Sequence, residues 1–246
     1  MNLSGNTVLI TGGASGIGLA FAERFLASGS EVIICGRRED KLAEAKAKYP
    51  QIQTRVCDVA KESERKALFE WTIENHRAVN VLINNAGIQR RVDLTENEDW
   101  EKTRSEIAIN FEAPIHLSRL FVPHFRKREN AAIVNVTSGL SFVPLANVPV
   151  YCATKAALHS FTLSLRHQLA ATPITVVEIA PPAVDTDLGG AGLHTFGVNV
   201  DEFADAIFAR LADGETEIAY GTAEKASRAS RAERDEIFKF MNRNAA

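Results

Sequence analysis

Short runs of β-branched and aliphatic residues alternate along this chain with longer segments in which hydrophobic residues recur at helical spacing. The short runs predict strands at residues 7–11, 31–35, 52–56, 79–83, 132–136, 174–179 and 217–220. The periodic segments predict helices near residues 17–28, 38–48, 61–76, 96–127, 150–171 and 201–212. Because parallel strands need a crossover of about a dozen residues, usually a helix, this alternation predicts a doubly wound α/β fold with about seven parallel strands.

Two segments depart from the alternation. Residues 185–200 (DTDLGGAGLHTFGVNV) are glycine-rich and irregular, and such segments in compact domains are often lids, so we expect a substrate lid there. Residues 223–243 are charged and alanine-rich, with Ile237, Phe238 and Met241 at helical spacing, and predict a C-terminal surface or interface helix. No repeat or linker interrupts the pattern, so we expect residues 1–246 to form a single domain.

Composition excludes several classes of protein. The 246 residues include 28 Lys and Arg against 31 Asp and Glu, a formal net charge of −3, which argues against a nucleic-acid binder. No apolar run approaches the roughly 18 residues of a membrane span, and the start MNLSGNTVLITGG resembles neither a secretory signal nor a transit peptide. Cys35, Cys57 and Cys152 fit neither a zinc nor a disulfide framework, so we expect reduced thiols, no metal and a cytoplasmic location.

A glycine-rich turn follows the first predicted strand directly, at residues 11–18 (TGGASGIG), and a helical pattern follows the turn. A strand, a tight turn and a helix N-terminus bring backbone N–H groups and the positive end of the helix dipole to one point. That point can bind a pyrophosphate. The glycine spacing differs from G-x-G-x-x-G, so the turn alone leaves a purely structural role open.

Three further motifs join this turn in a fixed order: NNAG at residues 84–87, Ser138, and YCATK at residues 151–155. Together they resemble the short-chain dehydrogenase/reductase family over roughly residues 5–190. The resemblance implies a Rossmann-type fold, oxidoreductase activity on a small molecule, a nicotinamide cofactor, and a homodimer or homotetramer. It implies these cofactor contacts: Gly12, Ser15, Gly16, Ile17 and Gly18 at the pyrophosphate, Asp58 and Val59 at the adenine, Asn85, Ala86 and Gly87 along the adenosine ribose, and Val184 and Thr186 at the nicotinamide amide.

The end of the second predicted strand bears on which nicotinamide cofactor is bound. Dehydrogenases that select NAD usually carry an acidic residue there, which bonds the ribose hydroxyls. This chain has Gly36 followed by Arg37 and Arg38, and two guanidinium groups can pair with a 2′-phosphate through charge-assisted hydrogen bonds. We therefore expect NADP(H) rather than NAD(H), against the alternative that both arginines are ordinary solvated residues.

Tyr151 and Lys155 are four residues apart in a predicted helix and so share one face. A phenol has a pKa near 10 and needs stabilisation of its anion to exchange protons at neutral pH. One ammonium at about 4 Å offers at most roughly 4 kcal/mol, or about 3 pK units, so we expect Lys155 to make Tyr151 acidic. The resemblance assigns the substrate carbonyl to Ser138, the nicotinamide ribose also to Lys155, and a water in a proton path to Asn110.

The residues around the expected substrate pocket are apolar, and they include six side chains: Leu140, Phe142, Leu145, Leu188, Leu193 and Phe196. The lid carries no Arg or Lys for an anionic substrate, so we expect a hydrophobic ketone or aldehyde, or the corresponding alcohol. Family members commonly carry Pro-Gly after the sixth strand, where this chain has Pro181-Pro182. Because proline fixes φ and removes a donor, Pro182 changes the turn next to Val184 and Thr186.

Two other functions share the same features. The fold could serve as a catalytically silent NADP(H)-binding regulatory protein, since a fold does not fix a function, although both Tyr151 and Lys155 are present. A lyase or epimerase that regenerates its cofactor is the other alternative. Assembly is expected through the helices near residues 103–125 and 150–170, which carry apolar residues on more than one face.

Overall fold

A computed structural model describes residues 1–96 and 99–243, and it confirms the predicted doubly wound parallel sheet. Seven strands form one sheet in the order β3-β2-β1-β4-β5-β6-β7, and every neighbouring pair is parallel. The strands are β1 Thr7–Thr11, β2 Glu31–Gly36, β3 Gln53–Val56, β4 Val81–Asn84, β5 Ala131–Val136, β6 Ile174–Ala180 and β7 Glu217–Ala219. Each overlaps a strand predicted from sequence, and β1 matches at both ends.

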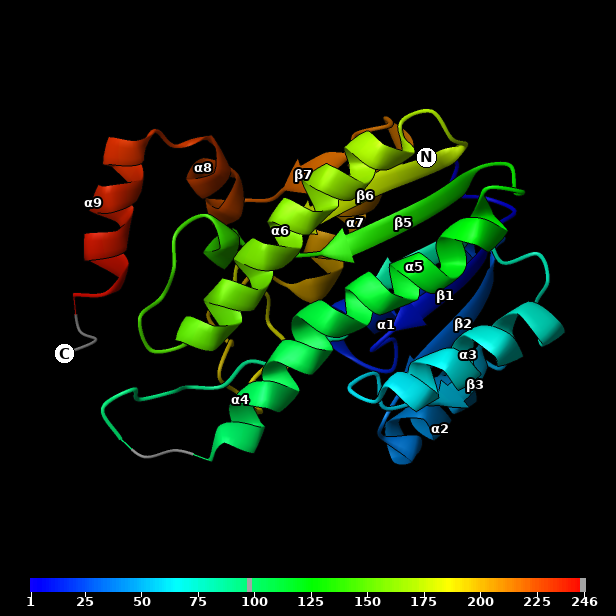
Figure 1. The fold of residues 1–246 in the computed structure, drawn as a ribbon, viewed down its shortest axis with the longest axis horizontal. Coiled ribbons are helices and arrows are strands. Elements are labelled where there is room, and N and C mark those ends of the chain that lie inside the picture. The colour runs from blue at the N-terminus through cyan, green and yellow to red at the C-terminus, as the bar shows by residue number, and fades with distance from the viewer. Residues whose placement is uncertain (97–98, 244–246) are drawn as a thin grey trace.

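Helices cover both faces of the sheet, as Figure 1 shows. One face carries α1 (Gly16–Ala27), α2 (Glu39–Lys48) and α7 (Val200–Ala212), and the other carries α3 (Glu62–Asn75), α5 (Ala113–Phe125) and α6 (Pro149–Leu169). The period of two along a strand divides the core between the faces. Val8 and Ile10 of β1 pack toward α1 and α7, whereas Leu9 packs toward α5.

The long helix predicted over residues 96–127 is divided in the structure. Within its described part, α4 runs from Trp100 to Ile107, a π-helical segment spans Ala108–Glu112, and α5 follows from Ala113. A π-helical turn widens the helix by one residue and rotates the side chains before it relative to those after it. Such turns occur frequently at functional sites, and this one contains Asn110.

The C-terminal segment differs from the prediction of one helix over residues 223–243. It forms α8 (Thr222–Arg228) and α9 (Arg231–Met241), separated by an extended Ala229. The break follows from the capping box at Ser230, whose hydroxyl accepts from the Glu233 backbone while the Glu233 carboxylate accepts from the Ser230 backbone. No residue of α9 is buried, and Figure 1 shows the helix standing apart from the sheet.

The expected lid has an ordered base. Val184 and Val198 form an isolated parallel bridge, which closes the irregular segment between them into a loop. Asn199 then caps α7 by accepting from the backbone of Asp201 and Glu202, so the helix begins one residue before its predicted start. The segment is therefore attached at both ends to the body of the domain.

Other expectations from composition can be compared with the described residues. All three cysteines are buried and free of disulfides, as predicted. Across residues 1–96 and 99–243, no helix has the length and apolarity that crossing a membrane requires. Within the same ranges, no three His, Cys, Asp or Glu side chains are grouped to hold a metal ion.

Candidate active site

The carboxyl ends of β1, β4, β5 and β6 meet at one edge of the sheet. From β1 the chain builds the sheet toward β2 and β3, and it then returns to add β4 on the opposite side. In open α/β sheets this reversal of strand order leaves a crevice outside the carboxyl ends, where ligands bind. The glycine turn, the NNAG motif, Ser138 and Pro181-Pro182 lie at the ends of these four strands, and the YCATK motif lies on α6.

The turn between β1 and α1 is built so closely that its glycines are required. Gly12 has a φ of +65°, and a methyl group added to it would lie 2.9 Å from the Cα of Ala86. A methyl group on Gly18 would lie 2.4 Å from the Gly12 carbonyl oxygen and 2.5 Å from Nδ2 of Asn85. Backbone therefore approaches backbone on both sides of the turn, as a pyrophosphate site requires.

Thr11, a residue that the sequence analysis did not single out for a role, holds the NNAG segment against this turn. Its hydroxyl oxygen accepts hydrogen bonds from the backbone N–H groups of Asn85 (3.1 Å) and Ala86 (3.0 Å). The Asn85 side chain in turn donates to the carbonyls of Thr11 (2.9 Å) and Gly12 (3.2 Å). These bonds fix the spacing between the two motifs that the resemblance assigns to the dinucleotide.

The other residues that the resemblance assigns to the cofactor lie along the same edge. Ser15 and Ile17 stand at the start of α1, and a methyl group on Gly16 would lie 3.2 Å from the side chain of Thr186. The other three follow β3 or β6: Asp58 accepts from the backbone of Ala60 at 3.1 Å, and Val59 and Val184 are buried.

The end of β2 faces open space. A methyl group on Gly36 would meet nothing within 4 Å, and Arg37 and Arg38 are both exposed. The Arg38 guanidinium donates to the hydroxyl of Ser15 at 3.0 Å, which places this positive charge against the glycine turn. The Arg38 side chain therefore lies between the glycine turn, where a pyrophosphate is expected, and the end of β2, where a 2′-phosphate is expected.

Tyr151 and Lys155 project from the first turns of α6, where both are buried (6% and 4% exposed). Pro149 begins this helix, at a position where its missing N–H costs no hydrogen bond. The Lys155 ammonium donates to the Val136 carbonyl at 2.7 Å and lies 5.7 Å from the centre of the Tyr151 ring. A methyl group on Gly87 would lie 3.6 Å from that ammonium, so the lysine reaches the NNAG segment.

Ser138 follows β5 at the same edge and is 7% exposed. It begins a short 3-10 turn, Gly139–Ser141, and its hydroxyl accepts from the Leu140 backbone at 3.1 Å. A hydrogen bond between Ser138 and the Tyr151 hydroxyl acts to lower the pKa of the tyrosine. The serine and tyrosine hydroxyls are thus neighbours, as expected from the sequence.

The electrostatics correct one expectation. Burial raises the pKa of Tyr151 above its ordinary value, and this effect outweighs the hydrogen bond with Ser138. Burial also lowers the pKa of Lys155 to about 8. The argument from spacing directed the ammonium at the phenol, but the ammonium is bonded to the Val136 carbonyl instead. In the protein alone, loss of hydration therefore dominates, and Tyr151 is not made acidic.

Asn110, from the π-helical segment, is fully buried against the irregular segment that follows the NNAG motif. Its Oδ1 accepts from the backbone of Ile88 at 2.9 Å, and its Nδ2 donates to the Ile88 carbonyl at 2.8 Å and to the hydroxyl of Thr154 at 3.2 Å. A methyl group on Gly87 would lie 3.5 Å from Oδ1. Asn110 and Thr154 therefore join three segments, and no sequence signal had pointed to Thr154.

The predicted substrate wall is only partly assembled. Leu140, Leu145 and Leu188 pack in one cluster with Val148, Tyr151 and Cys152. Leu193 and Phe196 of the lid are instead exposed, at 49% and 78%. Three of the six predicted residues thus border the site in this structure.

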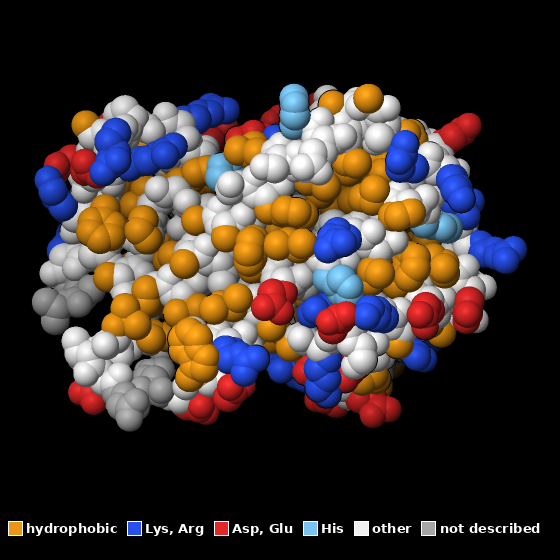
Figure 2. Space-filling view, viewed as in Figure 1, with side chains coloured by type: hydrophobic (Ala, Val, Ile, Leu, Met, Phe, Trp, Pro, Cys, Tyr) orange, Lys and Arg blue, Asp and Glu red, His pale blue; other side chains and the backbone are white. Residues whose placement is uncertain are grey.

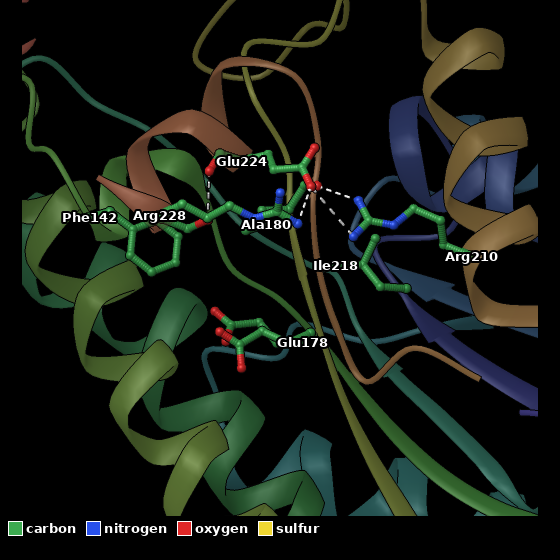
Figure 3. Close-up of a pocket in the computed structure, with 10 residues that line it drawn as sticks. Phe142, Glu178, Ala180, Arg210, Ile218, Glu224 and Arg228 are labelled. Carbon is green, nitrogen blue, oxygen red and sulfur yellow. Dashed lines mark hydrogen bonds and ion pairs between the residues drawn. The ribbon is translucent and has the colours of Figure 1, made fainter. Parts of the chain in front are cut away.

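Phe142 is placed elsewhere, because the chain turns away from the site after Ser141. It lines a pocket of about 160 Å³ between β6, β7 and α8 (Figure 3). There the Glu224 carboxylate pairs with Arg228 at 2.7 Å and lies 3.8 Å from Arg210. The prediction that Phe142 lines the substrate pocket is therefore wrong, since its ring packs with alanines of β6, β7 and α8.

The chain is similar to known proteins over most of its length. The family model described as short chain dehydrogenase matches residues 6–194. The chain is 51% identical to a Bacillus subtilis protein named "Uncharacterized oxidoreductase DltE", over 98% of each chain. Among solved structures, it resembles a short-chain dehydrogenase from Burkholderia cenocepacia in complex with NADP, with a TM-score of 0.85, 25% identity and 98% and 99% coverage of the two chains.

A second solved structure is a 3-ketoacyl-(acyl-carrier-protein) reductase from Brucella melitensis complexed with NADH, with a TM-score of 0.80, 26% identity and coverage of 90% of this chain and 99% of that one. The two neighbours therefore carry different nicotinamide cofactors. The family match covers more than half of the chain, and it includes the glycine turn, Ser138, Tyr151 and Lys155. The chain belongs to the short-chain dehydrogenase/reductase family and is an oxidoreductase with a Rossmann-like fold.

Proposed function

We propose that this protein transfers a hydride between NADP(H) and a carbonyl or secondary alcohol, with a hydrophobic ketone or aldehyde as substrate. The observation that carries the proposal is the meeting of the Tyr151 and Ser138 hydroxyls with Lys155 beside Gly87. This meeting place lies at the carboxyl edge of β5, next to the crevice between β1 and β4. A proton donor and a carbonyl-binding hydroxyl at a dinucleotide site are the groups that carbonyl reduction requires.

Each residue has a separate part in the reaction. A nicotinamide bound in the crevice would supply or accept the hydride. Ser138 donates a hydrogen bond to the substrate oxygen, where negative charge develops, and Tyr151 gives that oxygen its proton. Lys155 holds its ammonium 5.7 Å from the centre of the Tyr151 ring, and Asn110 fixes the backbone of Ile88. In alcohol oxidation, Tyr151 takes the proton instead.

The preference for NADP(H) rests on the end of β2. It presents no carboxylate at Gly36, and the two exposed guanidinium groups of Arg37 and Arg38 follow, one of them bonded to Ser15. A 2′-phosphate can pair with both, whereas the ribose hydroxyl of NAD(H) offers them no charge. Fluorescence titration should show tighter binding of NADPH than of NADH, and equal or tighter binding of NADH would contradict the preference.

The substrate class rests on the side chains beside Tyr151. Leu140, Leu145 and Leu188 border the hydroxyl, and they offer an uncharged ligand an apolar surface. A panel of aliphatic and aromatic ketones with NADPH tests this, with a charged carrier-linked ketone included. Turnover of the carrier-linked compound alone would refute the hydrophobic substrate. Net oxidation of NADPH in the same assay excludes a silent regulatory protein and a cofactor-regenerating lyase or epimerase.

We further propose that the protein assembles as a homodimer or homotetramer through the face that carries α5 and α6. Figure 2 shows hydrophobic side chains gathered on this face, and Leu163 of α6 is 41% exposed there. Apolar surface of this kind is common where subunits meet. Analytical ultracentrifugation at micromolar concentration should show a dimer or tetramer, and a monomer would contradict assembly.

A further inference from the structure

Glu106 of α4 carries a carboxyl group that is fully buried. Glu106 is 0% exposed, and among the residues that the structure describes neither carboxyl oxygen has a partner in good hydrogen-bond geometry, although the Arg90 backbone amide acts on it from nearby. Buried carboxylates are almost always paired, because an ion without partners loses its hydration and gains nothing in return. The resemblance to the family assigns no role to this position, so the unpaired carboxyl calls for a physical explanation.

The groups that face Glu106 come from two elements. Tyr151 and Cys152 lie on α6, which packs against α4, and Arg90 follows β4. The guanidinium of Arg90 is bonded elsewhere, since it donates to the Ser105 hydroxyl at 2.8 Å and to the Lys102 carbonyl. The positive charge of Arg90 is therefore held by other acceptors, and the carboxyl lies within electrostatic reach of the Tyr151 phenol and the Cys152 thiol.

Its place on the chain connects it to the site. Glu106 precedes Asn110 by four residues, at the end of the helix that leads into the π-helical segment. Asn110 is anchored to Ile88 and Thr154, and this fixes the position of the helix relative to α6. The carboxyl group is thus held in place near the reacting hydroxyl, although it lies in none of the motifs that resemble the family.

The charge of Glu106 changes near neutral pH. Burial raises its pKa to about 7, although the Arg90 backbone amide and charge oppose this. Its negative charge contributes to raising the pKa of both Tyr151 and Cys152. A carboxyl that is half ionised near pH 7 therefore gives the phenol two electrostatic environments, one neutral and one negative.

We propose that Glu106 is a positioning residue for proton transfer: the neutral carboxyl allows Tyr151 to release its proton, and the carboxylate keeps that proton on the tyrosine. The proposal rests on the proposed function, because it concerns the same hydroxyl. Carbonyl reduction needs Tyr151 protonated, and alcohol oxidation needs it ionised. The carboxylate therefore delays oxidation to higher pH and extends the range in which reduction proceeds.

The first experiment measures kcat/KM against pH for NADP⁺-dependent oxidation of a hydrophobic secondary alcohol such as cyclohexanol. In Glu106→Gln the pH of half-maximal activity should fall by about 0.5–1 unit, because the negative charge near Tyr151 is gone. Glu106→Asp keeps a titrating carboxyl but moves it by one methylene, so its midpoint should lie between those of wild type and Glu106→Gln. The matched control is Glu101→Gln on the same helix, an exposed residue paired with Arg104, and its profile should not move. An unchanged midpoint in Glu106→Gln overturns the proposal.

The second experiment needs no substrate and so separates this proposal from the proposed function. Infrared difference spectra of wild type minus Glu106→Gln should show a protonated carboxyl band that disappears with a midpoint near pH 7. Absence of that band overturns the proposal whatever the catalytic result. If the wild type oxidises no alcohol, the proposed function fails. Tyr151 ionisation is then measured with NADP⁺ from absorbance differences between chains with Tyr151 and with Tyr151→Phe, and a midpoint that Glu106→Gln does not lower overturns the proposal.

Glutamine matches glutamate in size, so Glu106→Gln is expected to fold, and thermal unfolding checks this. If it does not fold, Glu106→Asp becomes the test, because it keeps the charge but moves it by one methylene. The infrared midpoint and the oxidation midpoint should then both move from their wild-type values. Unchanged midpoints in a folded Glu106→Asp overturn the proposal.

Discussion

The nucleotide side of the site, around the turn from β1 to α1, and the substrate side, between α4 and α6, differ in what positions their functional atoms. On the nucleotide side, backbone lies against backbone, and Gly12 and Gly18 leave no room for a side chain. On the substrate side, buried side chains do the positioning, and Tyr151, Lys155 and Asn110 depend on their neighbours for charge and direction. Predictions made from sequence should therefore be less accurate on the substrate side.

The largest effect is expected on the substrate side, when the Tyr151 hydroxyl is removed. Tyr151→Phe should lower kcat/KM for carbonyl reduction by about a thousandfold, since positioned acid catalysis contributes roughly a hundredfold to ten-thousandfold. Binding of NADPH, measured by fluorescence titration, should stay within a few-fold of wild type because the glycine turn is untouched. Retention of more than about a tenth of the activity would show that another group delivers the proton.

The structure shows how far sequence reasoning reaches in each region. The strands and the glycine turn were predictable because alternation, glycine and the start of a helix are local properties, and β1 matches residue for residue. The π-helical segment at Asn110 was not predictable, since tertiary contacts to Ile88 and Thr154 hold it. Phe142 has the apolar side chain expected in a substrate wall, but the turn after Ser138 places it in another pocket.

The direction of the Lys155 ammonium was a further property that spacing could not give. Residues four apart share a helix face, and α6 satisfies that rule. The nearest acceptor, however, is the Val136 carbonyl of β5, which only the packing of helix on sheet brings within reach. Glu106 illustrates the same limit of prediction from sequence. Its spacing from Asn110 is evident in the sequence, but its burial without a partner is not.

The second expected effect is on the nucleotide side. Gly18→Ala places a methyl group 2.4 Å from the Gly12 carbonyl and 2.5 Å from Asn85, so the turn must open. We expect about a hundredfold loss in NADPH affinity, measured by titration, and about 1–3 kcal/mol lower stability, as overpacking typically costs. The control is Gly36→Ala, where an added methyl group meets nothing within 4 Å and thermal stability should hold. Wild-type affinity in Gly18→Ala would show that the turn does not bind the pyrophosphate.

A smaller effect separates the two cofactors. Arg38→Asp and Arg37→Asp should each weaken NADPH binding by about tenfold or more, as loss of a charge-assisted hydrogen bond predicts, and Arg37→Asp should reverse the preference toward NADH. Titrations of both nucleotides measure this. Arg104→Asp on α4, an exposed arginine paired with Glu101, should change neither affinity. A parallel loss for NADPH and NADH would mean that the arginines shape the turn rather than recognise a phosphate.

The smallest effect is expected when two buried carboxyl groups are compared by how the free energy of unfolding changes with pH. The pKa of Glu106 is about 7 in the folded chain, above its ordinary 4.5. Between those values the folded chain keeps a proton that the unfolded chain has released, so the free energy of unfolding falls as pH rises. Glu106→Gln removes this loss and, after allowance for solvent screening, should be more stable than wild type by about 1–2 kcal/mol at pH 8 relative to pH 5, measured by urea unfolding.

Glu178 of β6 is the matched case with partners, since it lies 2.8 Å from His159 and accepts from the Thr137 hydroxyl at 2.6 Å. This pairing raises the pKa of His159 above its ordinary 6.5. The stabilisation from the pair is therefore complete below pH 6.5 and disappears as pH rises through the folded value. Glu178→Gln should accordingly lose most stability at low pH, whereas Glu106→Gln gains it at high pH. A Glu106→Gln variant that is less stable than wild type at pH 8, as Glu178→Gln should be at low pH, would mean that partners stabilise the Glu106 carboxylate in the folded chain.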